Sequence, residues 1–252
     1  MTRVAFISDI HGNAVALDAV LADLRHRPVD GIVCLGDIAA GGPQPREAIN
    51  RLRKLNCVAL RGNADAWLLE GLPPGTSEAT QRLADIVTWT HEMLVPDESD
   101  YLAGLPSMLT IPIGEWTVLC FHGSPRTEVD ALLAQTPDAQ LDSVLAGTTP
   151  ADGFACGHTH LQLLRRYRRG LLFNPGSVGL PLGSLAPAPG GALPTWAEYA
   201  LAEVDRGDVE VTFRRVPVDV DALAATTEAM PNATWASDLE RRIMRWNAKA
   251  VA

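Results

Sequence analysis

Seven residues of the types that bind metal ions lie at or just after the ends of short apolar runs. They are Asp9, His11, Asp37, Asn63, His122, His158 and His160. Imidazole nitrogens mixed with carboxylate and carboxamide oxygens suit first-row transition metals better than calcium or magnesium. Seven ligands are too many for one ion, so we predict two divalent ions that share one carboxylate. Asp37 is the central candidate for that bridge.

A pair of such ions is suited to chemistry at phosphorus. Two ions about 3.5–4 Å apart stabilise both the attacking and the leaving oxygen, and they lower the pKa of bound water to about 7. Without cations, two carboxylates and four imidazoles packed in one place would be costly. Taken alone, Asp37 or Asn63 is more often a turn residue. The prediction therefore depends on all seven residues meeting at one place.

The elements that position these residues alternate between strand and helix in the first third of the chain. The strand-like runs RVAFIS, GIVCLG and CVALRG are separated by helical patterns at residues 13–27 and 45–55. This order predicts a parallel α/β unit, whose strand ends meet at one edge of a sheet. The later runs TVLCFHG and GFACGH add their histidines to the same rim. A glycine lies next to or near each of these ligands, which permits tight turns and close backbone approach.

The rest of the chain predicts four further features. Residues 64–105 are mostly helical in pattern and predict a small helical cap insertion. Residues 180–195 are rich in proline and glycine and predict a mobile loop that borders the substrate pocket. The run AEYALAEVDRGDVEVTFRRV predicts an antiparallel hairpin that turns at residues 205–208. Residues 234–248 predict a helix with Trp235, Leu239, Ile243 and Trp246 on or near one face.

Composition narrows the class of protein. The 252 residues are 47% hydrophobic and 20% charged, which predicts one large globular domain over residues 1–252. The formal net charge of −9 argues against a nucleic-acid partner. No stretch is long and apolar enough for a membrane span, and the N-terminus shows no cleavage signature. We therefore expect a cytoplasmic protein, with its four cysteines as buried free thiols because none forms a C-x-x-C pair.

The motifs DIH, GD, GNAD, HG and GHTH together resemble the signature of the calcineurin-like metallophosphoesterase superfamily. That signature runs D-x-H, G-D, G-N-H-[DE], H and G-H-x-H, and the match covers residues 9–160, with FNPGSVGLP extending it. SDIHGN, HGSPR and NPGSVG resemble the compact prokaryotic branch that includes small phosphodiesterases. The resemblance implies the α/β class and a four-layer α/β/β/α sandwich, in which two mixed sheets are flanked by helices.

The resemblance also implies how the ligands divide between two divalent transition-metal ions. One ion would take Asp9, His11, Asp37 and His160, and the other would take Asp37, Asn63, His122 and His158. Asn63 would also contact the bound phosphate, which makes it a catalytic candidate. Manganese is our first choice of metal, with iron, zinc, nickel and cobalt as alternatives.

The chain departs from the family pattern at Ala64, where the family often has a histidine. That histidine protonates the leaving group or stabilises the transition state, and the following acid, here Asp65, holds it. Asp65 is our second catalytic candidate. If it orients the ring, Ala64→His should raise the turnover of alkyl esters more than that of aryl esters. Alternatively, Ala64 widens the pocket for a larger substrate, and His91 or a metal-bound water supplies the proton.

We therefore predict a metal-dependent phosphoester hydrolase that uses a metal-bridging hydroxide. A phosphodiesterase acting on a small or nucleotide-type substrate is favoured. A phosphomonoesterase, a dinucleoside-polyphosphate hydrolase and a non-catalytic scaffold of the same fold stay open as alternatives, as does a homo-oligomer. Asn13 and Arg126 are substrate-binding candidates. Asn13 also fits a helix N-cap, and Arg126 also fits a surface pair with Glu128 or Asp130.

Overall fold

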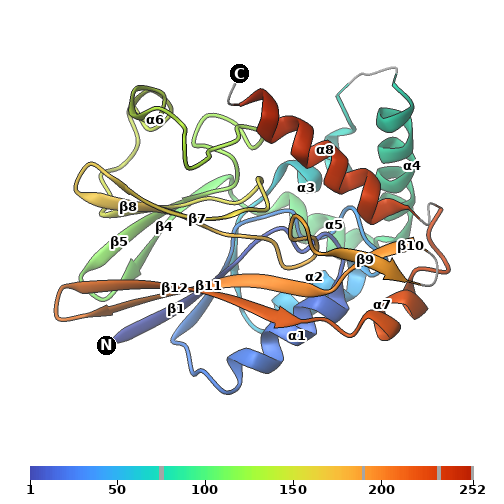
Figure 1. Ribbon diagram of the computed structural model, residues 1–252, viewed down its shortest axis with the longest axis horizontal. Coiled ribbons are helices and arrows are strands. Elements are labelled where there is room, and N and C mark those ends of the chain that lie inside the picture. Colours follow the sequence, from blue (N-terminus) through green and yellow to red (C-terminus); the bar gives the residue numbers. More distant parts are fainter. Residues whose placement is uncertain (74–76, 189–190, 232–233, 251–252) are drawn as a thin grey trace.

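Two five-stranded sheets pack face to face in the computed structural model, which describes residues 1–73, 77–188, 191–231 and 234–250 (Figure 1). In spatial order, the first sheet contains β12 (Asp208–Pro217), β11 (Trp196–Asp205), β1 (Thr2–Ile7), β2 (Gly31–Cys34) and β3 (Val58–Ala59). The second contains β4 (Met108–Ile113), β5 (Trp116–Phe121), β6 (Gly153–Ala155), β8 (Gly170–Pro175) and β7 (Gln162–Tyr167). β1, β2 and β3 are parallel, as are β5, β6 and β8, so both sheets are mixed.

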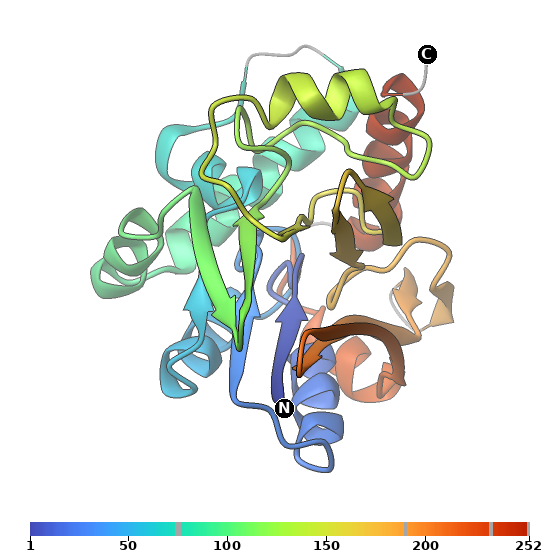
Figure 2. The same ribbon diagram turned by 90° about the vertical axis from the view of Figure 1, so that its left-hand side faces the viewer.

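Helices cover the outer faces of the two sheets. Apolar side chains from the inner faces, including Phe6, Cys120 and Phe173, fill the space between the sheets. α1 (Ala14–Leu24) and α2 (Pro45–Lys54) contribute Leu17 and Ile49 to the core beneath the first sheet, and α6 (Asp138–Val144) packs on the second. Figure 2 shows α6 and α1 on opposite sides with the strands between them. The predicted α/β/β/α sandwich is confirmed.

Three helices occupy the stretch for which helix was predicted after β3. They are α3 (Asn63–Glu70), α4 (Glu78–Met93) and α5 (Pro96–Ala103). α8 (Trp235–Lys249) contacts α4 and runs alongside it in Figure 1, and the short α7 (Val220–Thr226) precedes it. The predicted helix at residues 234–248 is confirmed, with Trp235, Leu239 and Ile243 buried. The side chain of Trp246 lies outside the described residues.

The hairpin prediction is confirmed, and the loop prediction is partly wrong. β11 and β12 pair antiparallel over their full length and turn at Arg206 and Gly207, both with positive φ. Within residues 180–195, β9 (Leu185–Ala188) and β10 (Gly191–Pro194) form a two-stranded sheet in place of an irregular loop. The sequence pattern did not predict these strands, because the segment is rich in proline and glycine and both residues are rare in sheet interiors. Residues 189–190 of the predicted loop lie outside the described part of the chain.

None of the helices in the described ranges combines the length and apolar character that a bilayer span requires. All four cysteines are free thiols, with Cys34, Cys120 and Cys156 buried and Cys57 partly buried. The prediction of unpaired thiols is confirmed, and burial raises the pKa of each of them.

Candidate metal centre

The strand order brings the carboxyl ends of both sheets to one rim. β1, β2 and β3 are parallel neighbours, so the segments that follow them carry Asp9, Asp37 and Asn63 to adjacent positions. The backbone joins two of these segments directly, because Asp9 N–H donates to Gly36 O at 3.0 Å and His11 N–H donates to Asp37 O at 2.9 Å. β5 and β6, parallel in the second sheet, deliver the three remaining histidines from the other side.

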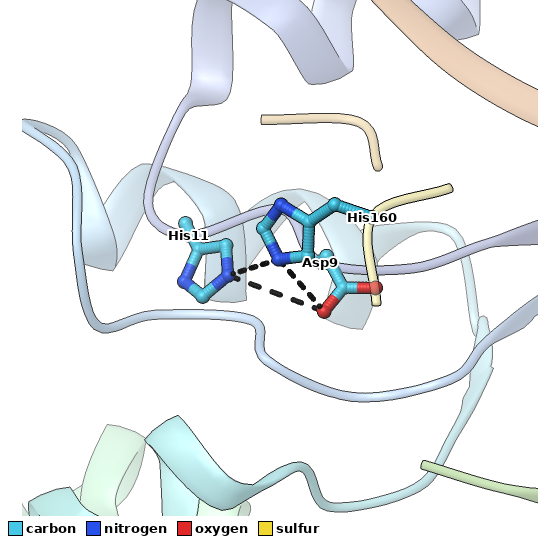
Figure 3. Close-up of side chains that lie close together, drawn as sticks. All are labelled: Asp9, His11 and His160. Atoms are coloured by element: carbon cyan, nitrogen blue, oxygen red, sulfur yellow. Dashed lines mark hydrogen bonds and ion pairs between the residues drawn. The ribbon is translucent and has the colours of Figure 1, made fainter. Parts of the chain in front are cut away.

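Asp9, His11 and His160 form the first group (Figure 3). The Nε2 atoms of His11 and His160 are 3.0 Å apart, and His160 Nε2 is 3.2 Å from Asp9 Oδ1. His11 Nε2 lies 4.0 Å from the same oxygen. Two rings and one carboxylate therefore face a common point.

Asp37, His122 and His158 form the second group. His122 Nε2 lies 3.4 Å from Asp37 Oδ2. Asn63 directs one end of its amide at both rings, 3.2 Å from His122 Nε2 and 2.7 Å from His158 Nδ1. With oxygen at this end, Asn63 completes a set of two imidazoles and two oxygen ligands.

Asp37 lies between the two groups. Its Oδ2 is 3.6 Å from His11 Nε2 in the first group and 3.4 Å from His122 Nε2 in the second. Its other oxygen, Oδ1, accepts a 2.7 Å hydrogen bond from the Ala64 N–H at the start of α3. This geometry is the one that the predicted bridge requires.

Three of the four rings are oriented by backbone carbonyls. The Nδ1 atoms of His11, His122 and His160 lie 2.7, 2.6 and 2.6 Å from the carbonyl oxygens of Ala40, Leu35 and Leu180. A carbonyl oxygen only accepts, so each Nδ1 carries a proton, and the neutral form of each ring would present its Nε2 lone pair to a metal ion. Lone pairs at 3.0 Å repel unless a cation lies between them. The donor set therefore fits divalent cations.

The electrostatics of the cluster also favour added positive charge. Burial raises the pKa of Asp9, yet the charge and hydrogen bond of His160 outweigh burial and lower it. Burial lowers the pKa of His122, but the charge of Asp37 raises it to about 10. The pKa of His158 falls to about 3, first because the ring is buried and second because His122 repels its proton. The carboxylates stay ionised, while the cluster cannot protonate every ring at once.

Backbone strain is concentrated at the predicted ligands. Asp9, His11, Asp37, His158 and His160 have φ values of 54°, 49°, 53°, 67° and 56°. A left-handed backbone costs a non-glycine residue about 1–2 kcal/mol. Five such residues in one cluster are typical of a functional site, where the surrounding fold holds strained geometry in place.

Two glycines let the backbone approach the ligands closely. A Cβ at Gly62 would lie 2.2 Å from Asp37 Oδ1, and one at Gly157 would lie 2.2 Å from Ser8 Oγ and 3.0 Å from Asp9 Oδ2. Any side chain at either position would displace a carboxylate. This confirms the expectation that glycines beside the ligands serve close approach.

Asp65 binds the backbone around it. Its carboxylate is fully buried and accepts hydrogen bonds from the N–H groups of Ile38 at 2.9 Å, Ala39 at 3.2 Å and Gly62 at 3.1 Å. Both oxygens accept backbone hydrogen bonds here, and the role of Asp65 as the partner of a ring at position 64 stays a prediction. Asp65 is a positioning residue: it holds the turn that carries Asp37 against the start of α3.

The substrate-binding candidates Asn13 and Arg126 make polar contacts within the protein. Asn13 is fully buried, and its amide donates to Gly179 O at 3.0 Å while its oxygen caps α1 through Ala16 N–H at 3.0 Å. The guanidinium of Arg126 donates to the Ser143 carbonyl beside α6. The polar groups of both residues bind the protein, and substrate contact by either residue stays a prediction. Neither Glu128 nor Asp130 pairs with Arg126: they accept from Arg61 and Ser124.

His91 is not positioned to replace the missing general acid. It lies on the exposed side of α4, and its Nδ1 is 2.9 Å from the Leu68 carbonyl oxygen. Beside the ligands, the pocket at the metal cluster is lined by apolar side chains from three helices. They are Ala64 and Trp67 of α3, Leu83 and Val87 of α4, and Leu239 and Ile243 of α8. Amphipathic periodicity cannot distinguish a core face from a face that covers a site.

Comparison with known proteins agrees with this centre. A model of the calcineurin-like phosphoesterase superfamily domain matches residues 2–203. The uncharacterized protein MJ0912 of Methanocaldococcus jannaschii is 31% identical over 87% of this chain and 89% of its own.

Two solved structures share the fold over nearly the whole chain. A metallophosphoesterase from Sphaerobacter thermophilus is 28% identical with a TM-score of 0.70, and 98% of each chain is covered. The hypothetical protein PH1004 from Pyrococcus horikoshii is 22% identical with a TM-score of 0.73, also with 98% of each chain covered. The chain belongs to the calcineurin-like phosphoesterase superfamily and is a metal-dependent phosphoester hydrolase.

Proposed function

We propose that this chain is a dinuclear phosphodiesterase that hydrolyses small or nucleotide-type phosphodiesters. The observation that carries the proposal is the position of Asp37, whose Oδ2 lies within 3.6 Å of a ring from each ligand group. A carboxylate shared in this way supports two ions close together, which is the arrangement used for in-line displacement at phosphorus.

The chain's own residues hold and orient the reacting groups. When bound, the two ions supply the acidity that activates a water molecule and the positive charge that stabilises the phosphoryl oxygens. Manganese remains our first choice because the ligands mix nitrogen and oxygen. The N-terminus of α3 faces the same point, since Ala64 N–H already donates to Asp37 Oδ1. This helix end adds favourable partial charge for a phosphate.

The residues around the pocket favour esters with good leaving groups. Beside the predicted ligands, the described lining consists of apolar side chains and Gly41, so no separate side chain there donates a proton to a departing oxygen. General acid catalysis is worth about 10²–10⁴-fold for a poor leaving group and little for a good one. Aryl and nucleotide-type leaving groups need that help least.

A substrate panel tests the proposal. The protein with Mn²⁺ added is assayed on bis(p-nitrophenyl) phosphate, p-nitrophenyl phosphate, a dinucleoside polyphosphate and a cyclic nucleotide, with Asp37→Ala as the inactive control. We expect the highest kcat/KM on a diester and none above background in Asp37→Ala. A preference for the monoester or the polyphosphate would replace the diesterase assignment with one of the alternatives. Turnover that survives in Asp37→Ala would contradict the shared-carboxylate mechanism.

A further inference from the structure

The predicted metal ligands are closed off from solvent. Their relative exposure is at most 3%, the value for Asn63, and that of Asp9 and His122 is 0%. A phosphoester must contact ions held by these side chains if it is to react. The burial of the ligands therefore raises the question of how a substrate reaches them.

The cavity beside the ligands is too small for a substrate. It measures about 10 Å³, which is about the space that one water molecule needs. A phosphate group alone has five heavy atoms, and a diester has more. The described arrangement is thus a closed state of the site.

α8 forms the outer wall of this cavity. Its residues Leu239 and Ile243 line the cavity together with His11, His158 and His160. α8 contacts α4, and Figure 1 shows both helices on the same side of the molecule. The superfamily match ends at residue 203, so α8 lies outside the region that the superfamily model describes.

We propose that α8 is a gate, which must move off the metal centre before a phosphoester binds. The proposal rests on the proposed function, because only a reaction at the metal centre requires this opening. Trp235 and Ala236 are fully buried and anchor the start of the helix. The part that moves is the remainder of the helix from Asp238 onward, which includes Leu239 and Ile243 of the cavity wall.

Polar contacts hold the gate closed on three sides. Arg82 Nε of α4 lies 3.1 Å from Asp238 Oδ2. Asn247 Nδ2 donates to Thr159 O at 2.9 Å, and Thr159 lies between the ligands His158 and His160. The Arg242 guanidinium lies over the Trp67 ring of α3, 5.4 Å from its centroid. Each contact joins α8 to a different segment around the cavity. A substitution that removes one of these contacts leaves all the predicted metal ligands in place.

Breaking single contacts tests the gate. Asp238→Asn removes the ion pair with α4, and Asn247→Ala removes the hydrogen bond to Thr159. The matched control is Arg241→Gln, because Arg241 also pairs with Asp238 but belongs to α8 itself and does not tie it to a neighbour. Each Mn²⁺-loaded variant is compared with the wild type for kcat/KM, for the rate at which a chelator removes the metal, and for amide hydrogen exchange along α8.

We expect both latch variants to raise kcat/KM and the chelation rate together by about two- to fivefold, the range for loss of a partly exposed ion pair or a hydrogen bond. Exchange in α8 should rise in parallel, while Arg241→Gln should match the wild type. Chelation and exchange that stay at wild-type rates in both latch variants would overturn the gate. Faster chelation and exchange in a protein that hydrolyses no phosphoester would support the gate and overturn the proposed function instead.

Discussion

Replacing Ala64 by histidine tests how tightly the apolar cover packs against the metal centre. Ala64 is 4% exposed and faces a cavity of about 10 Å³, so an imidazole ring has no free volume to enter. Overpacking a filled core costs about 1–3 kcal/mol. In a domain of this size, each kcal/mol lowers Tm by about 2–4 °C. We therefore expect Ala64→His to unfold roughly 2–12 °C below the wild type.

The same substitution should not restore general acid catalysis. Both oxygens of Asp65 already accept backbone hydrogen bonds, which we expect to compete with a bond to the new ring. The ratio of alkyl-ester to aryl-ester kcat/KM should stay at the wild-type value. This reverses the expectation drawn from sequence, in which Asp65 was the partner of a histidine at position 64.

The assay compares Tm and the alkyl-to-aryl ratio at equal metal loading. Ala64→Ser is the control for a small polar change. Ala64→His combined with Ile243→Ala tests whether space made in α8 recovers part of the lost Tm. A Tm equal to that of the wild type, together with an alkyl-to-aryl ratio about 10²-fold higher or more, would refute both the tight pocket and the role of Asp65.

Three further substitutions probe the surroundings of the centre. Asp65→Asn leaves a buried N–H donor without an acceptor, which should cost about 1–3 kcal/mol in thermal unfolding; an unchanged Tm would contradict the positioning role. Gly157→Ala places a Cβ 3.0 Å from Asp9 Oδ2, so titration calorimetry should show weakened metal binding, and wild-type affinity would contradict the close-approach account. Arg126→Ala should leave the substrate KM unchanged, since Arg126 binds the Ser143 carbonyl; a rise of about tenfold, equivalent to 1.4 kcal/mol, would restore it as a phosphate contact.

The meeting of the seven ligands was predictable because it depends on topology alone. Parallel strands bring their carboxyl ends to one edge, and each ligand follows an apolar run that is plainly a strand. The sandwich of two sheets followed from the family motifs. The edge strands β4 and β7 were not predicted from the sequence. Pro112 interrupts β4, and Arg165 and Arg166 place charge in β7. Prolines and charges are typical of sheet edges, where they prevent pairing with other chains.

Contacts between distant segments were not predictable from local pattern. The carbonyls of Ala40 and Leu180 orient His11 and His160, yet a carbonyl belongs to every residue and gives no signal in the sequence. Leu239 and Ile243 show ordinary helical spacing, and only the packing of α8 places them over the centre. The sequence motif drew attention to Asp65 as the partner of a ring at position 64, but it gave no sign that Asp65 accepts hydrogen bonds from backbone N–H groups.

Metal content per chain tests the central claim most directly. The claim is that two ions share Asp37, with one held by Asp9, His11 and His160 and the other by His122, His158 and Asn63. We predict two Mn²⁺ ions per wild-type chain after reconstitution and gel filtration. Asp37→Ala should lose both, while Asp18→Ala, which removes an exposed carboxylate, should keep both. One ion per wild-type chain, or two ions retained in Asp37→Ala, would contradict the account.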